Sequence, residues 1–339
     1  MGEVILQLEN ITKNFGNLKA LDQISYSIRE GEIIGLVGPN GAGKTTTLKL
    51  IGRLNRPNSG TIFIRNIDGE LQDIYQNRNG LVEMGFLIDI PQFYNTNPWC
   101  LLRYIMNIRN YPKVEIEPRI DLLLKDFELY KWKYKNIKVF SKGMVQKLGF
   151  IIAIINEPEL IILDEPQTGL DPESRIKIRK YLKILQDEGK SILISSHLLS
   201  EIRELCDKIA IINKGRLVGF DSIDNLERKF KIKRLICEID EKIAPEKVNE
   251  LLAKITRSLK PYFKSTINDE ELLKKVSYNP DTPSLEINYE GLRESRSKIL
   301  EILYTNFKSD FTISAFYEPK ISQIEKLYSQ TVTINKKEG

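Results

Sequence analysis

One short segment combines three closely spaced glycines with a lysine and two threonines. It fits the pattern G-x-x-x-x-G-K-[ST] and reads Gly38-Pro39-Asn40-Gly41-Ala42-Gly43-Lys44-Thr45-Thr46. Such glycines let backbone N–H groups turn inward toward phosphates, while the lysine reaches the β- and γ-phosphates and the threonine hydroxyl reaches Mg²⁺. The alternative is a glycine-rich turn that happens to precede a lysine. The pattern predicts a cradle for a nucleoside triphosphate with Mg²⁺.

Two adjacent carboxylates end an apolar run farther along the chain. Asp164 and Glu165 follow directly after residues 160–163. Ligands of a parallel sheet gather at the carboxyl ends of its strands, so we expect Asp164 to hold Mg²⁺ directly or through a water. We expect Glu165 to polarise a water for in-line attack on a γ-phosphate. The alternative is that both acids cap the following turn, but adjacent carboxylates repel each other and need a nearby cation.

The elements that must position these residues alternate between short apolar runs and helical patterns. Residues 33–37, 160–163 and 192–194 read as buried strands of a mainly parallel sheet with helices on both faces. A helix over about 43–54 would begin under the phosphates, where its dipole favours negative charge. Residues 4–8 and 24–28 read as half-exposed strands.

Two further regions differ in composition or pattern from the alternating strands and helices. A segment rich in Tyr, Asn and Lys, about 91–158, reads as an inserted helical subdomain. Lys131, Lys133, Lys135 and Lys138 crowd there around two aromatic residues, either as a solvated face or as a contact for lipid headgroups or a partner. The pattern restarts beyond a boundary near 228–233. We therefore predict a first domain over 1–228 and a small α/β accessory domain over 233–330, with strands at 235–239, 285–289 and 311–316 and helices at 245–259 and 291–307.

The composition narrows the function classes. The chain has 339 residues, and its net charge of +5 is too small to indicate a nucleic-acid-binding field. The three cysteines form no C-x-x-C pair, which favours a reducing compartment over a disulfide framework. With His197 as the one histidine, a multi-histidine metal site is excluded. No secretory signal or apolar run long enough to span a bilayer is visible.

Several motifs together resemble the ATP-binding cassette (ABC) family over about residues 3–225. Residues 140–147, Phe-Ser-Lys-Gly-Met-Val-Gln-Lys, are similar to the family signature Leu-Ser-Gly-Gly-Gln, here represented by Ser141, Lys142, Gly143 and Met144. Residues 169–171 resemble the D-loop and end in Asp171, while residues 195–197 resemble the switch segment and end in His197. The resemblance implies that His197 contacts the γ-phosphate. It also implies that Phe15 stacks on adenine, although Phe15 could be a core residue.

The signature motif has a physical reading of its own. Ser141 is a good N-cap for a helix running to about 155, and its hydroxyl with the following N–H groups forms a second anion site. The resemblance implies that this site contacts the ATP bound on an opposite subunit. ATP would then join two cassettes, and hydrolysis would release them.

The sequence departs from the family pattern at two places. Lys142 and Met144 stand where the family usually has Gly and Gln. This variant resembles cassettes of a subgroup of exporters whose signature often carries Lys at the position of Lys142. At the position expected for the Q-loop glutamine stands Asp89, which could touch Mg²⁺ or its waters or be a surface loop acid, and Gln92 could substitute for it.

The resemblance implies the Mg²⁺- and ATP-dependent ATPase subunit of a transporter, and we expect an exporter. Its expected partners are a separate transmembrane permease at the cytoplasmic face of the membrane and a second cassette, identical or paralogous. The alternative is a soluble cassette ATPase acting on ribosomes or DNA, which tends to carry two cassettes or a long coiled-coil insertion. A non-hydrolysing cassette is disfavoured because Lys44, Asp164, Glu165 and His197 are all present.

Overall fold

A computed structural model describes residues 2–76, 80–89, 95–197, 202–223, 225–226, 233–262, 275–280, 282–289 and 293–317. The chain divides into two compact units, and the division falls after Leu226. From the sequence, we predict that the first domain ends near this division, at residue 228. In the described residues no helix is both long enough and apolar enough to cross a bilayer.

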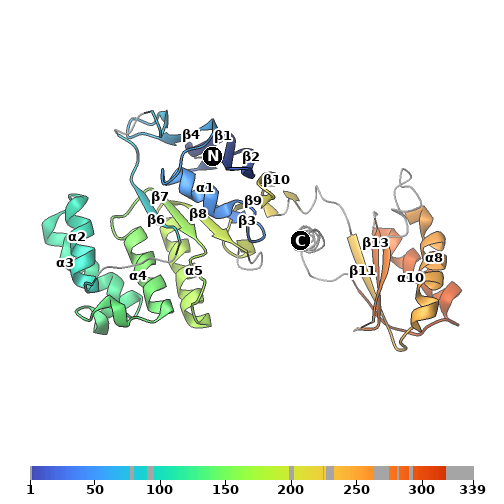
Figure 1. The fold of residues 1–339 in the computed structure, drawn as a ribbon. Coiled ribbons are helices and arrows are strands. Elements are labelled where there is room, and N and C mark those ends of the chain that lie inside the picture. The colour runs from blue at the N-terminus through green and yellow to red at the C-terminus, as the bar shows by residue number, and fades with distance from the viewer. Residues whose placement is uncertain are drawn as a thin grey trace. The chain divides into compact units, whose positions relative to one another are not determined.

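The first unit is built around a six-stranded sheet in the order β10-β9-β3-β8-β7-β6 (Figure 1). The bounds are β3 Ile33–Val37, β6 Met84–Leu87, β7 Leu160–Asp164, β8 Ser191–Ser196, β9 Lys208–Asn213 and β10 Arg216–Asp221. All pairs are parallel except β9 with β10. Every residue of β3, β7 and β8 is buried, as expected for strands covered on both faces.

A second sheet in this unit is antiparallel, in the order β2-β1-β4-β5. Its strands are β1 Val4–Phe15, β2 Leu18–Arg29, β4 Ser59–Arg65 and β5 Leu71–Asp73. Strands β1 and β2 form a long hairpin, so the half-exposed strands predicted at 4–8 and 24–28 are longer than the sequence pattern indicated. Helix α1, Lys44–Ile51, packs with this sheet and with the core strands in one apolar cluster.

The inserted subdomain consists of α2 Pro98–Ile108, α3 Lys113–Asp126, α4 Lys142–Ile154 and two short 3-10 helices, Tyr130–Trp132 and Ile137–Val139. Helix α4 contacts β6 and β7, and α5, Pro172–Asp187, contacts β8. The solvated reading of the lysine cluster is wrong for Lys133. Its side chain is 7% exposed, and its ammonium pairs with Asp121 at 2.6 Å because burial demands an opposite charge.

The second unit is an antiparallel sheet with helices on one face. Its elements are β11 Lys233–Ile239, α8 Pro245–Ser258, a 3-10 turn Lys260–Tyr262, β12 Val276–Asn279, β13 Ser284–Tyr289, α10 Arg293–Phe307 and β14 Ile313–Tyr317. The sheet order is β12-β13-β11-β14. This βαββαβ chain order is the split βαβ arrangement. Strand β12 was not predicted.

Candidate functional site

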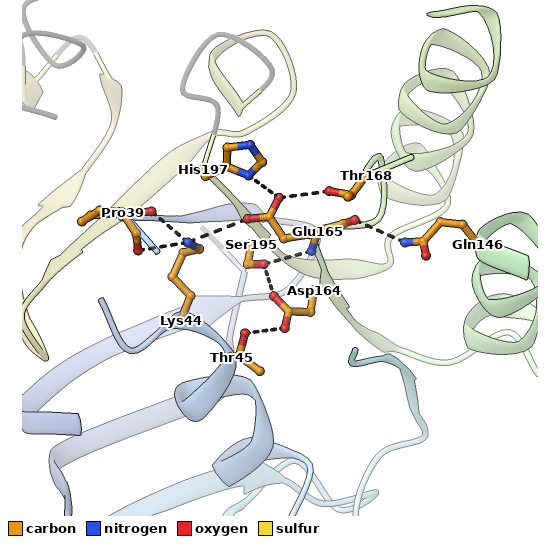
Figure 2. Close-up of polar contacts among 10 residues, drawn as sticks. Pro39, Lys44, Thr45, Gln146, Asp164, Glu165, Thr168, Ser195 and His197 are labelled. Atoms are coloured by element: carbon orange, nitrogen blue, oxygen red, sulfur yellow. Dashed lines mark hydrogen bonds and ion pairs between the residues drawn. The ribbon is translucent and has the colours of Figure 1, made fainter. Parts of the chain in front are cut away.

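The site lies where neighbouring parallel strands end. Strand β8 lies between β3 and β7, and Ser195 of β8 is level with Leu36 of β3 and Asp164 of β7. The chain that leaves β3 forms the glycine-rich loop, and the chain that leaves β7 continues with Glu165. The topology therefore brings both sequence-predicted motifs to one edge of the sheet (Figure 2).

The glycine-rich loop turns sharply into α1. Gly43, the residue before the helix, has φ +113°. A Cβ there would lie 2.6 Å from Leu21 Cδ2 and 2.8 Å from the Ala20 carbonyl oxygen, so glycine is required for both conformation and space. The turn directs the first N–H groups of α1 toward the same edge of the sheet, where an anion would meet them.

Lys44 is a buried cation held by its own loop. Its side chain is 7% exposed, and its ammonium donates to the Gly38 and Pro39 carbonyl oxygens at 2.8 and 3.3 Å (Figure 2). Burial lowers the pKa of Lys44, and the carboxylates of Glu165 and Asp164 oppose that shift. The ammonium is 3.8 Å from Glu165 Oε1, so the loop lysine and the strand-end acid face each other.

Asp164 joins two elements through its two oxygens. The Thr45 hydroxyl donates to Asp164 Oδ2 at 2.6 Å, and the Ser195 hydroxyl donates to Asp164 Oδ1. Asp164 is 7% exposed and Ser195 is fully buried. The structure thus places Thr45 and Asp164, the two sequence-predicted metal ligands, side by side.

Glu165 is held by side chains from three segments. His197 Nδ1 lies 2.7 Å from Glu165 Oε2, and the Thr168 hydroxyl donates to the same oxygen at 3.4 Å (Figure 2). With Lys44 opposite, the carboxylate sits between an imidazole and an ammonium. These contacts hold the carboxylate beside the lysine of the glycine-rich loop.

One cleft of about 800 Å³ is lined by Lys44, Thr45, Glu165, Thr168 and His197 among others, whereas Asp164 and Ser195 are not part of its described lining. It contains most of the residues predicted to bind nucleotide, and its described lining is Phe15, Leu18, Lys19, Ala20, Asn40, Gly41, Ala42, Gly43, Lys44, Thr45, Thr46, Glu165, Thr168, His197, Lys214 and Gly215. Phe15 ends β1 and is 46% exposed, so it is not a core residue. The Lys13 ammonium lies 5.0 Å from the centre of its ring.

The signature residues lie outside this cleft lining. Ser141 caps α4, as the sequence predicts, because its Oγ accepts from the Met144 N–H at 3.3 Å. The Lys142 side chain crosses over the D-loop, where a Cβ added at Gly169 would lie 3.2 Å from Lys142 Cδ and Cε. Asp171 in turn caps α5 by accepting from the Ser174 N–H at 2.9 Å. The signature and the D-loop thus touch within one chain.

Asp89, the Q-loop candidate, is 57% exposed and pairs with Lys49 of α1 at 2.6 Å. It is not among the described residues that line the cleft. Gln92 lies outside the described residues.

Three polar residues at the site were missed by sequence reasoning as partners of the two acids. They are Ser195, which bonds Asp164; Thr168, which bonds Glu165; and Gln146 of α4, whose amide donates to the Glu165 carbonyl oxygen at 3.2 Å. Only Ser195 carried a usable signal, since it ends a buried strand that a parallel sheet would place beside Asp164.

A parallel sheet with a glycine-rich lysine loop and a strand-end acid pair defines a phosphate-loop nucleotide hydrolase. A sequence profile of the family described as "ABC transporter" matches residues 21–168. An ABC transporter ATP-binding protein of Methanocaldococcus jannaschii is 36% identical over 66% of this chain and 80% of its own length. The chain therefore belongs to the ABC transporter ATP-binding proteins, and it is an ATP-hydrolysing subunit of such a transporter.

Two further relatives and two solved structures are also similar to this chain. The bacitracin transport ATP-binding protein BcrA of Enterococcus faecalis is 36% identical over 67% of this chain and 72% of its own length. The lantibiotic transport ATP-binding protein SrtF of Streptococcus pyogenes is 33% identical over 67% of this chain and 96% of its own length.

A solved ATP-binding subunit of an ABC transporter has a TM-score of 0.62 and 28% identity, covering 67% of this chain and 93% of that one. A cassette solved as a post-hydrolysis dimer with ADP and phosphate has a TM-score of 0.57, covers 64% of this chain and 98% of that one, and at 24% identity shows the shared fold.

Proposed function

We propose that this subunit powers an exporter through ATP-driven dimerisation of two cassettes, coupled to a separate transmembrane permease at the cytoplasmic face of the membrane. The two named transport proteins above, for bacitracin and for lantibiotics, support the exporter class. The second cassette is a copy of this chain or a close paralogue. No nucleic acid takes part, in keeping with the small net charge of +5.

Nucleotide binding is assigned to the cleft. The loop from Gly38 to Thr46 wraps the phosphates with its N–H groups, and Lys44 exchanges its two carbonyl partners for β- and γ-phosphate oxygens. That exchange is favourable because an ammonium bonds a phosphate more strongly than a neutral carbonyl. Phe15, exposed on the cleft wall, offers its ring face to adenine.

Hydrolysis is assigned to Glu165 with His197. The Glu165 carboxylate, held by His197 and Thr168, orients a water for attack on the γ-phosphate. When ATP draws Lys44 away toward its phosphates, the 3.8 Å ion pair weakens and the carboxylate is left to the water. His197, 44% exposed in the cleft, contacts the γ-phosphate.

The donor set at Asp164 fits Mg²⁺. A hydroxyl oxygen of Thr45 and a carboxylate oxygen of Asp164 lie 2.6 Å apart, and Mg²⁺ prefers oxygen ligands from one or two protein groups together with phosphates. In the described residues no group of three or more His, Cys, Asp and Glu could hold an ion alone, which fits an ion shared with the nucleotide. Thr45 and Asp164 would hold the ion, whose charge would offset the negative charge of the phosphates.

The position of the signature residues supports the proposal that two cassettes form a dimer. Ser141 and the free N–H groups of α4 form an anion site on the same chain, yet the described lining of the nucleotide cleft includes no signature residue. A second chain, turned to face the first, can bring its Ser141, Lys142, Gly143 and Met144 to the open side of the ATP. Asp171 belongs to the D-loop, which touches the signature at Gly169. It would therefore lie in the same interface between the two chains.

Size-exclusion chromatography with ATP tests this function. Glu165→Gln should still bind ATP, lose nearly all hydrolysis and elute as a stable dimer. Ser141→Arg, which places bulk and charge at the anion site, should elute as a monomer while its ATP affinity stays within a few fold. A fully active Glu165→Gln would refute the role of Glu165, and equal loss of affinity and dimerisation in Ser141→Arg would refute action across two chains.

A further inference from the structure

The main chain at Glu165 is in an unusual conformation. Its φ is +47°, in the left-handed region that residues with a Cβ seldom occupy. Such a conformation persists only where surrounding contacts hold it. The direction of the Glu165 side chain depends on this φ, so whatever holds the main chain also aims the carboxylate.

Three hydrogen bonds hold the peptide groups on either side of Glu165. The Glu165 N–H donates to Ser195 Oγ at 3.0 Å. The Glu165 carbonyl oxygen accepts from the Thr168 N–H at 3.1 Å. It also accepts from Gln146 Nε2 at 3.2 Å (Figure 2). Ser195 belongs to the core sheet and Thr168 to the same turn. Gln146 alone among the three comes from the helical subdomain.

Gln146 lies on the helix that begins at the signature. Ser141 caps α4, and Gln146 follows little more than one turn later on the same hydrogen-bonded helix. The Gln146 side chain is 3% exposed, packed between α4 and the turn after β7. A helix this regular moves as a unit over such a short span, so a shift of its Ser141 end also shifts the Gln146 amide.

We propose that Gln146 is a positioning residue that couples the signature to the Glu165 carboxylate of the same chain. Its amide fixes the Glu165 carbonyl and thereby the left-handed main chain. When Ser141 contacts the ATP held by a second copy, the position of α4 becomes fixed. The Gln146 amide then holds Glu165 in the orientation needed for hydrolysis. This inference rests on the proposed function, because it presupposes that Glu165 orients the water and that Ser141 acts across two chains.

Gln146→Met provides the test in the full-length chain. Methionine keeps the length and burial of the side chain but donates no hydrogen bond. We expect kcat for ATP to fall about tenfold or more, because a small misplacement of a catalytic group costs this much. KM for ATP should stay within about twofold, since Gln146 is not among the described residues that line the nucleotide cleft. Gln146→Asn, one methylene shorter, should lose kcat in the same way and serves if the methionine variant folds poorly.

Gln167→Met is the matched control. Gln167 is also a buried glutamine, 4% exposed and two residues from Glu165, but its side-chain amide has no hydrogen-bond partner. The same substitution there removes no side-chain hydrogen bond, so kcat should remain at the wild-type value. Loss of kcat in both variants would assign the effect to packing and overturn the proposal.

A double-mutant comparison tests the link to the signature. If Gln146 transmits the state of Ser141, then Ser141→Ala together with Gln146→Met should lower kcat no further than the more severe single variant. Losses that multiply would overturn the coupling, as would a wild-type kcat in Gln146→Met. The proposed function is judged separately by Glu165→Gln: if that variant is inactive while Gln146→Met is fully active, only the present inference falls.

Discussion

Gly85 is the position where a single methyl group should do the most damage to the signature helix. It lies in β6, level with Ile161 of β7, and α4 passes directly over it. A Cβ at Gly85 would lie 1.7 Å from the Ala153 carbonyl oxygen and 2.8 Å from Pro158 Cγ. The first of these atoms belongs to the backbone of α4 and cannot rotate away.

The size of the effect follows from that gap. Ordinary contacts of a Cβ begin at 3.4 Å, so Gly85→Ala requires α4 to retreat by 3.4 − 1.7 = 1.7 Å or the sheet to bend. Overpacking of this kind costs about 1–3 kcal/mol, and the backbone contact places Gly85→Ala at the upper end. At about 2–4 °C per kcal/mol for a domain of this size, Tm should fall by about 6–12 °C. The same retreat moves Ser141 and Gln146, so kcat should fall as well.

Thermal melts and ATPase rates of three proteins measure this: wild type, Gly85→Ala and the control Gly52→Ala. At Gly52 the closest atom to an added Cβ is Ile88 Cδ1 at 3.2 Å, the end of a flexible side chain that can give way. We expect the control to melt within about 2 °C of wild type, less than the shift for 1 kcal/mol. If Gly85→Ala also does so and keeps its kcat, the close packing of β6 against α4 is refuted.

Three other predictions concern single contacts. Gln167→Met removes a buried amide without partners and should raise Tm by about 2–4 °C for each kcal/mol regained, and a lower Tm in calorimetry would contradict this. The Ser174 hydroxyl and N–H hold the pKa of Asp171 down to about 2, below its usual value of about 3.9. The charge of Asp171 therefore stabilises the fold fully above about pH 4, and the Tm difference from Asp171→Asn should vanish as the pH falls through about 2; a constant difference would argue against it. The Lys49–Asp89 pair, in which Lys49 is half-buried and Asp89 exposed, should show a coupling of about 0.2–1 kcal/mol in a double-mutant cycle of unfolding, and a value above about 2 kcal/mol would mean that the pair is shielded from water.

The sequence predicted the site best where the signal was local. Lys44, Thr45, Asp164 and Glu165 occupy fixed places relative to a strand end, and a parallel sheet brings such ends together whatever the rest of the chain does. The Ser141 cap was equally predictable, because capping depends on a few consecutive residues.

Contacts that depend on tertiary packing left no such signal. Gln146 contacts Glu165 because α4 packs on β6 at Gly85. A glutamine and a glycine, read in the sequence, do not predict that contact between the two elements. Lys133 is buried and paired with Asp121 of α3, a partner that the run of lysines does not reveal. The four-residue strand β12 lies at a sheet edge and lacks an apolar run, so its Ser277 and Asn279 resembled a loop.

The most direct test of the proposed mechanism is the structure of Glu165→Gln with ATP and Mg²⁺. We expect two chains facing each other, with each γ-phosphate contacted by Lys44 of one copy and by Ser141 of the other. A single chain that encloses its ATP, with Ser141 facing solvent, would contradict the account.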